Sequence, residues 1–291
     1  MLILLMLAST QLILLTSLDY TELELDPDAR SSSIDNTQVA TIEVGLDHAC
    51  AIGTAGQMKC WGDGTNGKTG HENTDDYGDQ SEEMGQYLMF TDGGDGLTFD
   101  DVSAGNRFTC GLMSDASVKC WGSNEFLGSN AGVAGSGSLG DGYLEMGEGL
   151  QKVNLGDWNA TSIAAGGSHA CAIVNNGSAD SLACWGNNDF GQCDVPEGLG
   201  TSKNPVVQIA ASEFHTAALL FDGSVACWGG NSFGQCDVPE GIGAPGNRVV
   251  SIDAGGNSFI GSAHTFAILE DGSIAFWGTS YYGVSISPEG V

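Results

Sequence analysis

Basic side chains are scarce in this chain. Eight Lys and Arg stand against 37 Asp and Glu among 291 residues, which leaves a formal net charge of -29 at pH 7. Nucleic acid and anionic membrane surfaces are therefore unfavourable partners on electrostatic grounds. We expect no nucleic-acid binding, and either a protein partner with a basic patch or a saline environment. The alternative is that the acidic residues only keep the surface solvated.

Helical periodicity is missing as well. No stretch between Tyr20 and Val291 repeats apolar residues every 3.6 positions, so we expect almost no helix. A long hydrophobic run occurs in residues 1–18, MLILLMLASTQLILLTSL, before an acidic and polar stretch. This run has no basic start and no small-residue cleavage site, and it is near the lower limit for spanning a membrane. Three alternatives remain open: a cleaved export signal, a retained anchor, or a start site that is not the true one.

Catalytic constellations are not recognisable either. No nucleophile, base and orienting group stand at a familiar spacing, and no paired carboxylates occupy a catalytic context. We expect a protein that is not an enzyme, with no catalytic residues, no bound metal and no cofactor. A propeller hydrolase or lyase remains an alternative, and it would need acidic and basic groups along a central channel.

Two phosphate-loop matches are expected to be inert. Residues 62–69, GDGTNGKT, satisfy G-x-x-x-x-G-K-[ST], but acidic, helix-poor residues follow where a helix must begin. Residues 135–140, GSGSLG, match G-x-G-x-x-G inside a Gly-Ser loop. We therefore predict no nucleotide binding, and we expect Lys68→Ala to leave the thermal stability unchanged.

The chain does contain one pattern five times. A His-x-Cys-Ala-Ile-like stretch, a turn and Cys-Trp-Gly recur, and the tryptophans of the five copies lie 60, 64, 43 and 49 residues apart. Such a period is typical of a modular array. The tryptophans are Trp61, Trp121, Trp185, Trp228 and Trp277.

Each unit reads as a set of short β-strands. An apolar segment precedes the His strand and the Trp strand, and Asp222-Gly223 and Asp271-Gly272 are typical of tight hairpins. The apolar segments are residues 102–105, 163–166, 206–211 and 249–254. An all-β array of this kind predicts a β-propeller, in which small sheets pack face to face around an axis.

At these residues the chain resembles the regulator of chromosome condensation repeat family. Its units carry Gly-x-x-His-Thr-x-Ala-Leu and then Val-x-x-Trp-Gly-x-Asn-x-x-Gly-Gln, to which residues 186–192 (GNNDFGQ) and 229–235 (GGNSFGQ) are similar. The resemblance covers about residues 39–291 and in style is nearest to exported bacterial and archaeal members. It implies a seven-bladed propeller, whereas five units are recognisable. Either the ring is incomplete, or five blades close by themselves, or this is a piece of a longer chain.

The resulting division of the chain has three parts. Residues 1–18 are a hydrophobic export signal or anchor, residues 19–38 an acidic polar spacer, and residues 39–291 the repeat β-propeller domain. Contact with a membrane is expected only through residues 1–18, if the leader is retained.

Six of the nine cysteines stand in pairs at one phase of the first three hairpins. In the first two hairpins an odd-length turn places the two cysteines directly opposite, within disulfide reach, and the third pair occupies the same phase with three extra residues in its turn. The predicted disulfides are Cys50–Cys60, Cys110–Cys120 and Cys171–Cys184. Ala217 opposes Cys227 in the fourth unit, so the position tolerates an apolar residue, which favours a structural disulfide over a redox-active or metal-binding pair. We therefore expect an extracellular or cell-surface protein.

Three cysteines remain unassigned. Cys193 and Cys236 share the phrase FGQCDVPEG, which recurs 43 residues apart, and Cys227 lies on the fourth Trp strand. Because nine is odd, at least one thiol is free or bonded to another chain.

Four histidines recur at one phase of different units, so they cannot converge on one ion unless they face the axis. We expect structural imidazoles that bond to the backbone near the blade turn. They are His48, His169, His215 and His264. The acidic loop 72–83 fails the calcium-loop template, because Tyr77 and Met84 fall where ligands belong. It is predicted to be a solvated loop, with a weak cation site as the alternative.

The function predicted is that of an exported, non-catalytic scaffold that binds a protein through its face loops. The long insertions at residues 63–98 and 123–150 are the candidates for specificity, and the predicted partner contacts are Tyr87, Phe90, Phe126 and Tyr143. The alternative implied by the family is guanine-nucleotide exchange on, or regulation of, a small GTPase.

Overall fold

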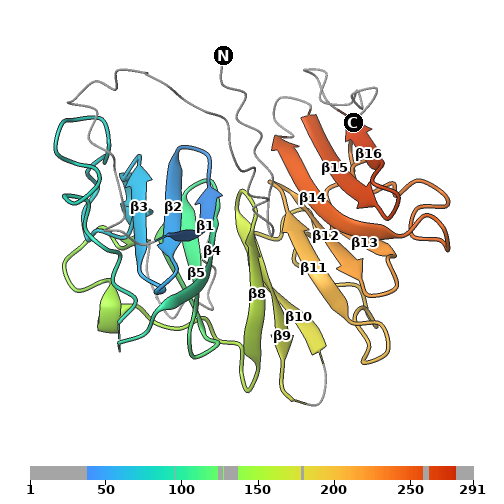
Figure 1. The fold of residues 1–291 in the computed structure, drawn as a ribbon, viewed down its shortest axis with the longest axis horizontal. Helices are drawn as coiled ribbons and strands as arrows, with labels where there is room; N and C mark the ends of the chain where they lie inside the picture. The colour runs from blue at the N-terminus through green and yellow to red at the C-terminus, as the bar shows by residue number, and fades with distance from the viewer. Residues whose placement is uncertain are drawn as a thin grey trace, which may run out of the picture.

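A computed structural model describes residues 38–94, 96–123, 127, 137–177, 180–257 and 262–279. The leader, the spacer up to residue 37 and Phe126 lie outside the described residues. Five small antiparallel sheets, which we call blades 1 to 5, follow one another in chain order (Figure 1). The prediction of an all-β array with five blades is confirmed.

Every blade has an inner strand, a His strand and a Trp strand, hydrogen-bonded in that order. Blade 1 holds β1 (Val39–Val44), β2 (His48–Gly53) and β3 (Met58–Gly62), and blade 2 holds β4 (Phe99–Ala104), β5 (Phe108–Met113), β6 (Val118–Ser123) and the short β7 (Ser138–Leu139). Blade 3 holds β8 (Asn159–Ala165), β9 (His169–Asn175) and β10 (Asp180–Gly186), and blade 4 holds β11 (Val206–Ala211), β12 (His215–Leu220) and β13 (Val225–Gly229). Blade 5 holds β14 (Val249–Asn257), β15 (Ser262–Leu269) and β16 (Ile274–Thr279).

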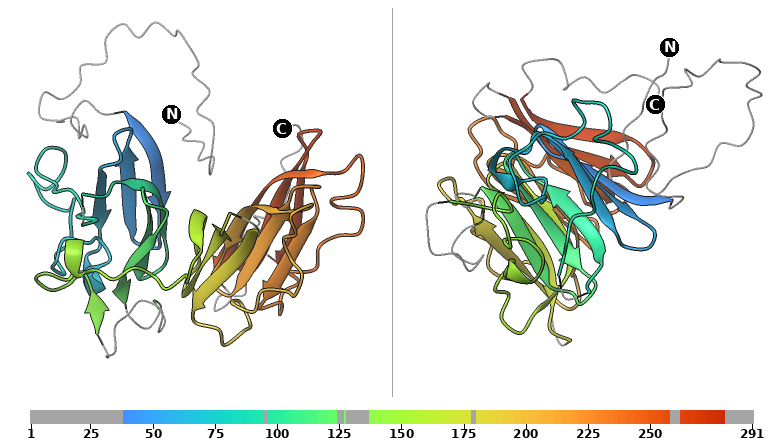
Figure 2. Two further views of the ribbon diagram at one scale, coloured as in Figure 1. Left: turned by 90° about the horizontal axis from the view of Figure 1, so that it is seen from below. Right: turned by 90° about the vertical axis from the view of Figure 1, so that its left-hand side faces the viewer.

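The blades form a curved array in which the inner strands of neighbouring blades contact each other. β1 contacts β4, β4 contacts β8, β8 contacts β11 and β11 contacts β14. Figure 2 shows the same succession from two further sides. Two short 3-10 turns, η1 (Thr65–Gly67) and η3 (Gly147–Gly149), lie in the connectors. No helix in the described part of the chain is long and apolar enough to cross a membrane.

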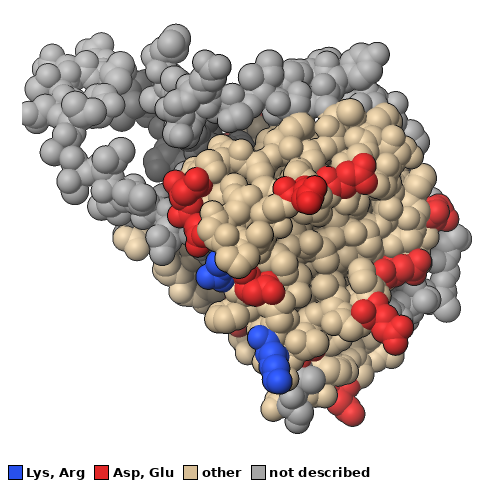
Figure 3. All heavy atoms as spheres, turned by 90° about the vertical axis from the view of Figure 1, so that its right-hand side faces the viewer, with Lys and Arg blue, Asp and Glu red and all other residues tan. Residues whose placement is uncertain are grey.

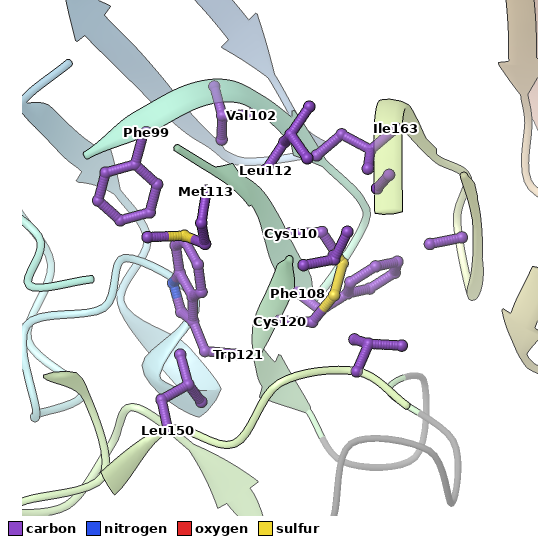
Figure 4. Packing of buried hydrophobic residues seen from close by; sticks show 14 of the residues in the cluster. Phe99, Val102, Phe108, Cys110, Leu112, Met113, Cys120, Trp121, Leu150 and Ile163 are labelled. Carbon is purple, nitrogen blue, oxygen red and sulfur yellow. A yellow bond between two sulfur atoms is a disulfide. The ribbon is translucent and has the colours of Figure 1, made fainter. Parts of the chain in front are cut away.

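The hydrophobic core lies between the blades rather than within them. A Val or Ile at one phase of the inner strands of blades 2 to 5 packs against the sheet before it, on Cys and aliphatic side chains of the His and Trp strands. Figure 4 shows this packing around blade 2, where Ile163 of blade 3 lies beside Leu112 and the Cys110–Cys120 disulfide. Burial of these side chains supplies the main stabilisation of the array.

The two end faces of the array differ from the inner ones. Ile42 stands at the same phase as Val102, Ile163, Ile209 and Ile252, which are 1% to 7% exposed, but it is itself 58% exposed. At the other end Ile268 and Ile274 of blade 5 are exposed. Figure 3 shows the molecule from the blade 5 side, where most of the surface is uncharged and acidic side chains are scattered over it. Among the described residues, therefore, no sheet covers the first face of blade 1 or the last face of blade 5.

Candidate functional site

A polar network crosses the blade interfaces, and it contains three of the four repeat histidines. His48 Nε2 lies 2.8 Å from Thr109 Oγ1 of the next blade. Thr109 Oγ1 in turn donates to the carbonyl of Lys68, which also accepts from Trp121 Nε1. The network therefore ties the His strand of one blade and the connector after it to the next blade.

The same arrangement recurs further along the array. His169 contacts Thr216 at 2.8 Å, and His215 contacts Thr265 at 3.0 Å. Thr216 and Thr265 donate to the carbonyls of Gln192 and Gln235, which stand where Lys68 stands in blade 1. Because each threonine gives its proton to a carbonyl, the imidazole Nε2–H is the donor toward its oxygen.

The expectation that the repeat imidazoles bond to the backbone is therefore wrong for His48, His169 and His215. Their partners are threonine hydroxyls on the following blade, because the His strand faces that blade and its own backbone is already paired in the sheet. One signal was present in the sequence. Where the histidine is replaced by Phe108, the next unit has Ala170 in place of threonine.

Burial keeps these imidazoles neutral. It lowers the pKa of His48 and of His215 to about 4, and that of His169 to about 3. The Lys68 ammonium adds to the effect at His48, and the proximity of a second imidazole adds to it at His215 and His169. A second proton would give the buried imidazole a charge that water cannot solvate, so the neutral form is favoured. These residues join neighbouring blades, and among the described residues they belong to no group that could hold a metal ion.

Lys68 of the phosphate-loop match has a structural role that its motif does not predict. The side chain is buried, and its Nζ lies 2.7 Å from Asp47 Oδ1 and 3.1 Å from Asp63 Oδ1. The residue is the repeat equivalent of Gln192. The structure supports the opposite expectation for Lys68→Ala, a loss of stability, because the substitution removes a buried cation with two carboxylate partners.

Four disulfides are present in the described residues, Cys50–Cys60, Cys110–Cys120, Cys171–Cys184 and Cys227–Cys236. The first three join the cysteine pairs that the hairpin spacing predicts, and each joins Cα atoms 4.1 Å apart. The fourth joins the Trp strand of blade 4 to its connector, and Cys193 is free. Four disulfides are typical of a protein that folds in an oxidising compartment.

Buried lysines hold the two long insertions in place. Lys119 donates to the carbonyls of Gly93, in the first insertion, and Gly147, in the second, while Lys59 donates to the carbonyl of Gly85. Both lysines are almost fully buried, so their charges are satisfied by these loops. Sequence analysis did not find this role, since a lysine within an apolar strand carries no local signal for it.

The insertions also bond to each other. The backbone N–H of Met146 donates to Glu72 Oε1 at 3.3 Å, and the N–H of Gly147 donates to the carbonyl of Asp92. Asn66 Nδ2 reaches Ser138 Oγ at 3.0 Å. We call the described residues 63–94, 96–98 and 137–150 the insertion surface, because these contacts make them one ordered unit.

The predicted partner contacts lie partly on this surface. Tyr87 and Phe90 are exposed in the first insertion, and Tyr143 is 84% exposed in the second. Phe126 lies outside the described residues. Met89 and Leu144 are exposed as well and were not singled out from the sequence.

Several carboxylates of the acidic loop serve the fold of the loop. Glu83 Oε2 accepts from the N–H groups of Gly78 and Gln80, and Asp76 Oδ1 accepts from the N–H of Gly64. Side-chain bonding to Glu83 raises the pKa of Asp79. Within the described residues, no three His, Cys, Asp or Glu side chains are grouped so that they could hold a metal ion.

A hollow of about 430 Å³ lies where the inner strands end. Glycines and alanines of all five blades line it, and Glu213 is the titratable residue among its described lining. Burial raises the pKa of this carboxyl. The described lining thus offers a single carboxyl and no basic partner for it.

Comparison with known proteins identifies the repeats. The family model of the regulator of chromosome condensation (RCC1) repeat matches residues 39–68, 99–126, 160–192 and 206–235. The chain belongs to the RCC1 repeat family. The matched segments begin at or within a residue of the inner strands of blades 1 to 4, so the RCC1 units and the blades coincide.

The relatives share the RCC1 fold at low identity. The ultraviolet-B receptor UVR8 of Arabidopsis thaliana is 25% identical over 67% of this chain and 42% of its own length. Yeast RCC1 (Prp20), solved with Kap60 bound, superposes with a TM-score of 0.60 at 18% identity, covering 86% of this chain and 59% of that one. The ectodomain of the Physcomitrella patens receptor kinase CR4 gives 0.52 at 21% identity, covering 86% and 53%.

This chain therefore spans about half the length of each of these relatives. Likeness at such identities shows the β-propeller fold of the RCC1 repeats and does not transfer the partners of those proteins.

Proposed function

We propose that this RCC1 repeat protein is an exported, non-catalytic scaffold that binds a protein partner with a basic patch through its insertion surface. The observation that carries the proposal is that Lys59 and Lys119 anchor the two insertions. These bonds fix the position of long loops that lie outside the strands of the blades. A loop held in this way presents Tyr87, Phe90 and Tyr143 to solvent with little entropy left to lose on binding.

Charge and redox chemistry support the same assignment. The net charge of -29 favours a cationic partner, and it should speed association at low ionic strength. Four disulfides support export. Exposed aromatic residues flanked by carboxylates are suited to a protein surface that combines apolar contacts with Lys or Arg.

The experiment is capture of partners from the surface and secreted fraction of the source organism, with three forms of the protein compared. One form carries Tyr87→Ser, Phe90→Ser and Tyr143→Ser. A second carries Asp75→Asn and Glu82→Gln, which neutralise loop carboxylates without removing the backbone bonds made by Asp76 and Glu83. The control carries Phe221→Ser, an exposed aromatic residue on the hairpin turn of blade 4.

We expect the aromatic variant to lose the captured partner, the charge variant to retain it only at low salt, and the control to match the wild-type protein. Unchanged capture by the aromatic and charge variants, with no effect of salt, would show that the insertion surface is not the binding site.

A further inference from the structure

Blade 3 contains three cysteines around one disulfide. Cys171 on β9 is paired with Cys184 on β10, and Cys193 lies free in the connector nine residues after Cys184. Blade 4 has the same layout with one difference, because Ala217 stands at the position of Cys171. There the Trp-strand cysteine, Cys227, is paired with the connector cysteine, Cys236, over the same separation of 9 residues.

The two connectors have the same internal hydrogen bonds. The N–H of Cys193 donates to Asn188 Oδ1 at 2.8 Å, and the N–H of Cys236 donates to Asn231 Oδ1 at 2.8 Å. Asn188 in turn donates to Asp194 at 2.8 Å, as its repeat equivalent does to Asp237 at 2.8 Å. Cys193 is therefore held by the backbone frame that brings Cys236 into disulfide contact, with Cα atoms 5.1 Å apart.

We propose that Cys184 is shared between two alternative disulfides, so that blade 3 carries a thiol–disulfide switch in which Cys193 displaces Cys171. The Cys193 thiol loses its proton, and the thiolate attacks Sγ of Cys184. The Cys184–Cys193 bond forms as the Cys171–Cys184 bond breaks, and Cys171 leaves as a thiolate that takes up a proton. The exchange is an isomerisation, so it needs no oxidant or reductant.

The resting state is the hairpin disulfide. Burial, together with the nearby carboxylate of Asp194, raises the pKa of Cys193 to about 12, which keeps the thiol protonated. Its Sγ also donates to the carbonyl of Asn187 at 3.4 Å. Exchange therefore requires the connector to open, or a small thiol to carry the exchange in steps.

The two pairings place the covalent constraint differently. The hairpin disulfide joins β9 to β10, which the sheet already pairs, whereas Cys184–Cys193 would fasten the connector between blades 3 and 4 to the sheet. This connector carries Gln192, whose carbonyl accepts from Thr216 and Trp228. The switch thus acts on the connector that supports the interface between blades 3 and 4.

The first test is Cys171→Ala, which copies the alanine of blade 4. We expect a Cys184–Cys193 disulfide, so that the count of alkylatable thiols falls from one to none. Cleavage before Asp180 and Asp189 places the three cysteines on separate peptides, which makes the new link visible by mass spectrometry without reduction. A count of two, with Cys184 and Cys193 both alkylated, would overturn the proposal.

The reciprocal test, Ala217→Cys, adds a cysteine and removes none, so it does not depend on tolerance of a lost disulfide. We expect the introduced thiol to pair with Cys227 and Cys236 to become alkylatable. If Cys227 stays paired with Cys236, the residue opposite the Trp strand does not decide the pairing and the proposal is wrong.

The wild-type protein is then equilibrated with reduced and oxidised glutathione and quenched with acid. A Cys184–Cys193 isomer with Cys171 alkylated is expected, and it should be missing from the Cys193→Ser control. Absence of this isomer from the wild-type protein would also overturn the switch.

Discussion

At the scale of single residues, the few cations of this chain hold main-chain and carboxylate oxygens of its loops. Lys59, Lys68 and Lys119 are buried. Lys59 and Lys119 donate to main-chain carbonyls of the first insertion, and Lys68 pairs with the carboxylate of Asp47. On the surface, Arg248 Nη2 donates to the carbonyl of Phe221 at 2.7 Å.

Lys68→Ala is predicted to lower the free energy of unfolding by about 2–4 kcal/mol, since it leaves two carboxylates without their cation and removes a buried stem. Urea unfolding of the wild-type protein and the variant measures the change. Lys203→Ala, at an exposed position, is the control and should stay within about 0.5 kcal/mol. Equal stability of all three proteins would contradict the structural role of Lys68.

At the scale of elements, each interface between neighbouring blades repeats one side-chain contact, which takes one of two forms. In the polar form a histidine meets a threonine, as between His169 and Thr216. In the apolar form Phe108 precedes a blade with Ala170, and both side chains are buried. The two forms predict different responses to acid.

Stability should fall as the pH is lowered from about 6.5 toward 4. The pKa of His169 is about 3 in the folded protein and near 6.5 when it is unfolded, so the unfolded chain binds more protons in this range. The loss is about 2 kcal/mol at pH 5 for one such residue. Glu43 acts in the opposite sense. Burial, with Asp101 and Asp253 nearby, raises its pKa to about 7, so its contribution is full below about 4.5 and is lost as the pH rises through 7.

The double variant His169→Phe with Thr216→Ala copies the apolar form of the interface. It should make this acid dependence shallower, while His48 and His215 keep their share of it. The measurement is the urea midpoint at pH 7, 6 and 5 for both proteins. An unchanged slope in the double variant would show that His169 does not carry the effect.

At the scale of the whole molecule, the array has two end faces whose apolar side chains lie in solvent. Ile42 and Ile163 stand at the same phase of blades 1 and 3, but only Ile163 is covered by a preceding blade. The same chemical change at these two positions therefore reports whether an end face is covered in solution.

Ile163→Ala is predicted to cost about 2–4 kcal/mol of unfolding free energy, and Ile42→Ala less than about 1 kcal/mol. Both are measured by urea unfolding of the same preparation. A similar cost at the two positions would mean that a further sheet or a partner covers the first face of blade 1.

Much of the fold follows from local spacing. The hairpin phase of the His and Trp strands predicts the register in which Cys50 faces Cys60 and Ala217 faces Cys227. The inner strand β1 was not identified, because its alternating sequence VATIEV ends in valine where the inner strands of the other units have alanine. Strands β4 and β8 begin several residues earlier than their apolar segments, beyond a bulge in each strand that interrupts the alternation.

The sequence by itself determined the number of recognisable units, the pairing of strands within a unit and the cysteines that face each other across a hairpin. Each of these depends on residues about ten positions apart, whose distance is set by strand geometry. Only the tertiary structure decided that His215 meets Thr265, that Lys119 holds two insertions and that Cys227 pairs with Cys236. These contacts depend on how one sheet stacks on the next and how a connector folds back, and neither is specified by the spacing of residues within a strand.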